Sequence, residues 1–259
     1  MASTTTHDDR RSVLDKVTRI LTAFRDEDLS LSLTDITQRT GIAKATTHRL
    51  CQDLIATGLL EREGTRYQLS MRLYQLGLRA AGQRLLGRAA RPVMEDLAQR
   101  LNNTAVLLAV PQGGELLCIE HAGSHRIRVR SAESGRQMRL CSSAAGKLTV
   151  AMLPAQFPLA EVTTRIVRRT PRTLTAAQFP AELERIRQRG YATESEESRI
   201  GYQAVAVPVL DNDRTYRGVL SAIAPTASST LARLLAELTS ATRAISVRLA
   251  RETAYAAPL

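Results

Sequence analysis

One stretch near the N-terminus, KATTHRLCQ at 44–52, has the side chains that nucleic-acid recognition needs. Its polar groups are Lys44, Thr46, His48, Arg49 and Gln52. Cations bind phosphate oxygens, while hydroxyl, amide and guanidinium groups hydrogen-bond to base edges in the major groove. This chemistry requires that the polar side chains share one exposed face of a helix, so the elements around them decide whether it is possible.

The apolar and small residues of the same stretch predict that helix. Thr47, Leu50, Cys51 and Leu54 fall at i, i+3, i+4 and i+7, the spacing of one buried stripe, and Gly58 marks the end of the helix. The residues predicted on the DNA-contacting outer face are Lys44, Ala45, Thr46, His48 and Arg49. The alternatives are a solvated face and, for Arg49, an ion pair that braces the first helix.

The flanking residues predict a winged helix-turn-helix. Ser32 and Asp35 have the spacing of a capping box that opens a helix, and Gly41 suits a turn with positive φ. Residues 59–62 and 65–69 read as two short strands around a Glu-Gly turn, which form the wing. Arg62 and Arg66 are predicted phosphate contacts, with a plain exposed hairpin as the alternative.

Composition narrows the class of protein. The net charge is +11, but residues 1–80 hold 12 Lys and Arg against 10 Asp and Glu, so the DNA argument depends on the motif. No apolar run approaches a membrane span and the N-terminus has no signal-peptide core, so we expect a cytoplasmic protein without membrane contact. Three widely spaced cysteines argue against disulfides and zinc. His121 and His125 lie in a strand end and loop, so we expect neither a metal site nor a cofactor.

The order of elements predicts an α+β protein of two domains. Residues 1–11 are expected to be a disordered tail, 12–69 the winged domain, 70–91 a linker helix region, and 92–259 a second domain opened by a helix at Pro92. The helices expected elsewhere are 12–24, 142–153, 175–189 and 228–250. The strands expected in the second domain are 104–110, 115–121, 127–130, 191–194, 203–210 and 217–223.

Several segments resemble one family in order and spacing. GIAKATTHRL at 41–50 and GTRYQL at 64–69 are similar to the recognition helix and wing of the IclR (isocitrate lyase regulator) family of bacterial transcription factors. GRQMRLCSSAAGK at 135–147, the stretch at 189–211 and GVLSAIAP at 218–225 resemble its second domain. The resemblance implies a GAF/PAS-like antiparallel-sheet domain that binds an effector, and assembly into homodimers or dimers of dimers.

The resemblance also implies an effector pocket, with departures from the family pattern. The residues carried over are Ser143, Ala144, Ala145, Glu194, Ala204, Ser221 and Ile223. Arg139 and Cys141 replace the family's usual Pro and His, and Ala204 and Ile223 replace a Cys and a Ser. Fewer polar groups favour an organic acid with an apolar body. Its acid end is expected at the N–H groups that open the helix at 142–153.

The leading hypothesis is a ligand-responsive, sequence-specific regulator of a catabolic operon, with double-stranded operator DNA and a small effector as partners. One rival is an enzyme acting on a small carboxylic acid. Its nucleophile and base types would be His121, Cys141, Ser142, Ser143 and Lys147, although these form no recognisable catalytic motif. The other rival is an architectural DNA-binding protein that has no effector.

Overall fold

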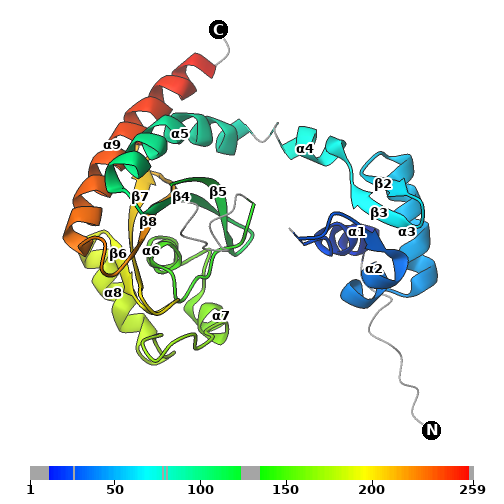
Figure 1. Ribbon diagram of the computed structural model, residues 1–259, viewed down its shortest axis with the longest axis horizontal. Coiled ribbons are helices and arrows are strands. Elements are labelled where there is room, and N and C mark those ends of the chain that lie inside the picture. Colours follow the sequence, from blue (N-terminus) through cyan, green and yellow to red (C-terminus); the bar gives the residue numbers. More distant parts are fainter. Residues whose placement is uncertain (1–11, 26, 78, 80, 124–134, 257–259) are drawn as a thin grey trace. The chain divides into compact units, whose positions relative to one another are not determined.

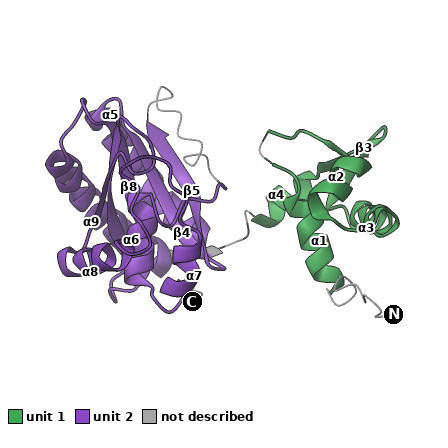
Figure 2. Cartoon of the chain, turned by 90° about the horizontal axis from the view of Figure 1, so that it is seen from below, with its two compact units in different colours: residues 1–80 green, residues 81–259 purple. Residues whose placement is uncertain are grey.

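A computed structural model describes residues 12–25, 27–77, 79, 81–123 and 135–256. The chain divides into two compact units, residues 1–80 and 81–259 (Figure 2). The expected tail at 1–11, the expected strand at 127–130 and His125 lie outside the described residues.

The first unit is a winged helix-turn-helix, as predicted (Figure 1). Its helices are α1 (Val13–Thr22), α2 (Leu33–Thr40), α3 (Lys44–Ala56) and α4 (Met71–Gly77), and its strands are β1 (Leu31–Ser32), β2 (Leu60–Glu63) and β3 (Arg66–Leu69). The sheet order is β1-β3-β2, with antiparallel pairs. Strand β1 was not predicted, because two residues are too few to show an alternating pattern.

Local signals set the helix ends in this unit. The capping box is confirmed: Ser32 Oγ accepts from the Asp35 N–H at 3.1 Å, and Asp35 Oδ2 accepts from the Ser32 N–H at 2.9 Å. Gly41 closes α2 with a φ of 64°, and its N–H donates to Thr37 O at 2.8 Å. The predicted stripe on α3 is buried as well. Because that stripe packs in the core, the opposite side of α3 faces solvent.

The second unit is a five-stranded antiparallel sheet with helices on both faces, which confirms the α+β class (Figure 1). The strand order is β5-β4-β8-β7-β6, from β4 (Ala105–Gln112), β5 (Glu115–Gly123), β6 (Ala192–Ser195), β7 (Tyr202–Leu210) and β8 (Tyr216–Pro225). Helices α5 (Ala81–Leu101) and α9 (Leu231–Ala256) bury one face of the sheet. The other face packs against α6 (Ala144–Met152), α7 (Leu159–Thr164) and α8 (Phe179–Arg189).

The expected helix start at Pro92 is wrong, because Pro92 lies inside α5, which begins at Ala81. Proline lacks an N–H and crowds the preceding turn, so it usually ends a helix. Here the apolar stripe continues on both sides of it, with Leu86, Ala90, Met94 and Leu97 all at most 4% exposed. Burial of these side chains against the sheet and α9 outweighs the local penalty. Helix α7 was not predicted.

A buried ion pair ties α6 to the connection between β6 and β7. Lys147 Nζ lies 2.5 Å from Glu197 Oε1, and the lysine side chain is only 1% exposed. The second oxygen, Glu197 Oε2, is buried without a hydrogen-bond partner in the described part of the chain. Burial raises the pKa of Glu197, and the Lys147 charge opposes that shift. Lys147 therefore serves the fold and does not face solvent as a base.

We expect Lys147→Met to lower the free energy of unfolding of the second unit by about 3–5 kcal/mol, because it leaves a buried carboxylate without its cation. Urea unfolding followed by circular dichroism measures the loss. The double variant Lys147→Met with Glu197→Met should recover most of it, because it removes both charges. A loss below about 1 kcal/mol in the single variant, or no recovery in the double, would show that the pair is not needed.

Candidate DNA-binding and effector-binding sites

The outer face of α3 presents the predicted DNA-binding residues to solvent. Lys44, Ala45, His48 and Arg49 are exposed and Thr46 is half-buried. The alternative for Arg49, an ion pair that braces the first helix, does not occur in the structure, because Arg49 NH1 lies 3.5 Å from Asp53 Oδ2 on its own helix. Arg49 thus stays on the face of α3 that also carries Lys44 and Thr46.

The N-terminus of α3 is open in a way that suits a phosphate. Its N-cap is Ala43, which supplies no side-chain hydrogen bond to the first turn. The first N–H groups of the helix are therefore available, and the helix dipole favours an anion there. Lys44 adds a full positive charge at the same end.

The two wing arginines are held by local hydrogen bonds. Arg62 Nε donates to Gly64 O at 2.8 Å, and its guanidinium lies 6.0 Å from the Tyr67 ring centre. Arg66 donates to both Oγ and O of Ser30, each at 2.8 Å. Both side chains remain exposed, so each keeps donors for a phosphate, with fewer left on Arg66.

The predicted effector residues come together on the face of the sheet that α6 covers. Glu194, Ala204 and Ile223 form one row across β6, β7 and β8, because Glu194 pairs with Ala204 and Ala204 pairs with Ile223. Ser221 lies two residues before Ile223 on the same face, where its Oγ donates to Val205 O at 2.9 Å. The Ser221 hydroxyl therefore donates its hydrogen bond within the sheet and not to a ligand.

The Glu194 carboxylate is hydrogen-bonded to the turn that follows β6. It accepts from the Glu197 N–H at 2.9 Å and from Ser198 Oγ at 2.7 Å. Burial raises the pKa of Glu194, and these hydrogen bonds counteract that shift. The carboxylate thus caps the turn after β6, and a ligand would meet it only at the edge of the site.

The start of α6 offers two unused donors. Ser143 is the N-cap: its Oγ accepts from the Gly146 N–H at 3.0 Å and donates to Arg139 O at 2.5 Å. The N–H groups of Ala144 and Ala145 have no acceptor within the described ranges, and both residues are 1% exposed. Ala144, Ala145, Ala204 and Ile223 belong to one apolar cluster. An anion with an apolar body matches this pairing of donors and surface.

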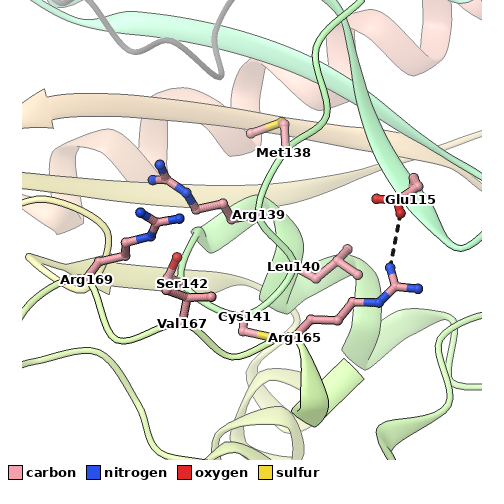
Figure 3. Close-up of a pocket in the computed structure, with 9 residues that line it drawn as sticks. All are labelled: Glu115, Met138, Arg139, Leu140, Cys141, Ser142, Arg165, Val167 and Arg169. Atoms are coloured by element: carbon pink, nitrogen blue, oxygen red, sulfur yellow. Dashed lines mark hydrogen bonds and ion pairs between the residues drawn. The ribbon is translucent and has the colours of Figure 1, made fainter. Parts of the chain in front are cut away.

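The sequence did not indicate a second feature, a cavity of about 250 Å³ beside the loop that precedes α6 (Figure 3). Arg139, Ser142 and Arg169 line it. The replacement of the family's proline by Arg139 was the signal available in the sequence. Arg169 carried no signal, because it lies in an arginine-rich run far along the chain.

The cysteines of the second unit are poorly placed to act as nucleophiles of an enzyme. Cys118 and Cys141 are buried, and burial raises the pKa of these thiols to about 12 and about 11, so both stay protonated at neutral pH. His121 lies on β5, opposite Leu107 of β4. Within the described residues, no cluster of metal-binding side chains occurs and no helix has the length and apolarity to cross a membrane.

Comparisons with known proteins agree with this geometry. The family model for the IclR C-terminal region of bacterial transcriptional regulators matches residues 79–247, and the IclR helix-turn-helix model matches residues 13–64. The HTH-type transcriptional regulator KdgR of Escherichia coli is 30% identical over 243 residues, which cover 90% of this chain and 91% of KdgR. The glycerol operon regulatory protein of Streptomyces griseus is 31% identical over 215 residues, with coverages of 82% and 84%.

Among solved structures, an IclR homolog from Microbacterium hydrocarbonoxydans, complexed with 4-hydroxybenzoate, has a TM-score of 0.81. It is 25% identical, and the match covers 93% of this chain and all of that one. The chain belongs to the IclR family of bacterial transcriptional regulators. It is accordingly a ligand-responsive, sequence-specific DNA-binding regulator of transcription, in a family of transcriptional regulators.

We expect Lys44→Ala and Thr46→Ala each to weaken operator binding by about 1–3 kcal/mol, since each removes a contact to the phosphate backbone or a base edge. Thr46→Ala should also relax base preference at one operator position. A gel-shift series on operator variants measures both effects. Lys16→Ala on α1 removes the same charge outside the predicted contacts and should bind normally. Equal affinities for all three variants and the parent would contradict the assignment.

Proposed function

We propose that α3 reads a palindromic operator in the major groove while the wing fixes its register on the backbone. The observation that carries this proposal is the uncapped start of α3, which offers free N–H groups beside Lys44 and Thr46. Ala45, His48 and Arg49 complete the reading face, and Arg62 and Arg66 bind flanking phosphates. Sequence choice comes from the base contacts, because phosphate contacts are much the same at every site.

We further propose that the second unit binds an organic acid with an apolar body. The N–H groups of Ala144 and Ala145, near the Ser143 cap, receive the acid end, and the body lies along Ala204 and Ile223, with Ser221 and Glu194 at the margin. Two buried donors without acceptors support this placement, since such groups are normally paired. The Microbacterium relative, whose bound 4-hydroxybenzoate is an acid with an aromatic body, supports the ligand class.

The proposed role is control of a catabolic operon in the cytoplasm. One relative, from Streptomyces griseus, is named for the operon that it regulates, the glycerol operon. The effector changes operator affinity by binding one state of the protein more tightly than the other. An architectural DNA-binding protein would show no ligand-dependent change, and an enzyme would turn its ligand over. Operator binding measured with and without the ligand tests the first outcome, and a screen for turnover of the ligand tests the second.

We also propose that the protein works as a homodimer or a dimer of dimers, because the two half-sites of a palindromic operator each bind one DNA-binding domain. Helix α4 supports this proposal. Its residues Met71, Tyr74 and Leu76 are 64%, 63% and 46% exposed, an apolar surface that is unusual for a helix facing water. A symmetry-related copy would cover these side chains.

We expect the parent protein to sediment as a dimer or larger species at micromolar concentration, and the variant Met71→Gln with Tyr74→Gln to dissociate at least tenfold more readily, since it places amides in the proposed apolar contact. Analytical ultracentrifugation over a concentration series makes the measurement. The matched control is Val247→Gln, a 54%-exposed apolar residue of α9. A parent protein that is a stable monomer and still binds its operator would refute the assembly.

We expect Ile223→Ser to weaken the native effector by about 1–3 kcal/mol, through lost apolar burial and an added hydroxyl that needs a partner. Calorimetric titration with a panel of aliphatic and aromatic acids, including 4-hydroxybenzoate, identifies the effector and measures the change. Ile200→Ser is the control, because Ile200 is 66% exposed and outside the proposed pocket. The apolar-pocket proposal fails if the parent binds only the smallest oxo-acids, or if Ile223→Ser binds as the parent does.

A further inference from the structure

The cavity beside the α6 entry loop has a different lining from the site proposed for the effector. Its walls come from residues 138–142, from alternate residues of the segment 165–169, and from Glu115 on β5. None of the seven effector residues named above lines it. A ligand in this cavity would therefore contact different side chains from a ligand in the proposed effector site.

Two exposed arginines line one end of this cavity, and among the described residues neither has a carboxylate bound to it. Figure 3 shows the guanidinium groups of Arg139 and Arg169 next to each other at one end, near the Ser142 hydroxyl. Neither side chain makes an ion pair or a hydrogen bond with the described residues. Arg165, in contrast, is paired with Glu115 at 3.2 Å (Figure 3). Two positive charges thus face one small space with no carboxylate bound to them.

The electrostatics of Arg139 agree with this arrangement. Partial burial lowers the pKa of Arg139, and the neighbouring charge of Arg169 lowers it further. The Glu194 charge acts in the opposite direction, but its carboxylate oxygens already accept hydrogen bonds from the turn after β6. An anion between the two arginines would relieve their repulsion.

Ser142 adds a third group, and the loop that carries it is fixed. Ser142 is 4% exposed, lines the cavity, and its hydroxyl has no hydrogen-bond partner among the residues described. The loop crosses α6 so closely that a Cβ on Gly146 would lie 2.1 Å from Arg139 O. The cavity wall is therefore held in place before a ligand arrives, which favours binding. Met138 and Leu140 give the same wall an apolar surface.

We propose that this cavity is a second ligand site, which binds a small organic dianion, a phosphate monoester or a dicarboxylate, between Arg139 and Arg169. Two guanidinium forks match two negative charges and can bind an oxyanion in bidentate fashion. The Ser142 hydroxyl donates to a third oxygen, and the apolar wall holds a short carbon chain. This inference goes beyond the proposed function, because Arg139 stands where the IclR pattern has proline.

Calorimetry on the full chain at constant ionic strength and pH 8 tests the site, with inorganic phosphate and succinate as dianions and acetate as a monoanion. At least one dianion should bind tenfold or more tighter than acetate. Phosphate alone would assign the site to phosphate monoesters, and succinate alone to dicarboxylates. Arg139→Gln and Arg169→Gln should each weaken that binding about tenfold or more, because each removes a charge-assisted pair.

Arg168→Gln is the matched control, since Arg168 is exposed like Arg169 but does not line the cavity, and its loss should change the affinity less than twofold. Ile223→Ser should also leave dianion binding unchanged, which separates this site from the effector pocket. The proposal is overturned if neither dianion binds, if Arg168→Gln weakens binding as much as Arg139→Gln, or if Ile223→Ser abolishes it. None of these results depends on operator binding.

Discussion

The close crossing of the 139–141 loop over α6 is the constraint on which both proposed ligand sites of the second unit depend. A side chain at Gly146 would meet Arg139 O at 2.1 Å and Leu140 Cα at 2.5 Å, so the crossing requires glycine. The Gly146 N–H also donates to the Ser143 cap, and the next residue, Lys147, pairs with Glu197 in the connection between β6 and β7. The glycine at the crossing, the Ser143 cap and the Lys147–Glu197 pair thus fix where α6 begins. The loop also places Arg139 in the wall of the cavity that precedes α6.

In the first unit, one face of α3 packs in the core and the opposite face is exposed. One face of α3 is buried by Leu50, Cys51 and Leu54, which orients the helix in the unit. Among the described residues, the side chains of the other face make no ion pair that would compete with DNA, apart from the exposed pair of Arg49 with Asp53. Exposed pairs of this kind contribute little and exchange easily for phosphate contacts. The helix can therefore bind DNA without any change in its own packing.

Sequence reasoning worked where the deciding interactions are local. The capping box at Ser32 and the buried stripe of α3 follow from residues a few positions apart, and both were predicted. Pro92 was misread, because the burial that keeps α5 helical comes from α9 and the sheet, far along the chain. The Lys147–Glu197 pair and the meeting of Arg139 with Arg169 also join distant segments. Family resemblance supplied the effector row, since nothing in the spacing of Glu194, Ala204 and Ile223 shows that they align.

The central claim is that occupancy of the second unit and operator binding by the first are coupled in one chain. The direct measurement is a thermodynamic cycle: operator affinity with and without the effector, by fluorescence anisotropy, and effector affinity with and without operator, by calorimetry. The account predicts the same factor in both directions, about 5–150-fold, because coupling between two sites is reciprocal. Operator affinity that the saturating effector leaves unchanged would contradict it.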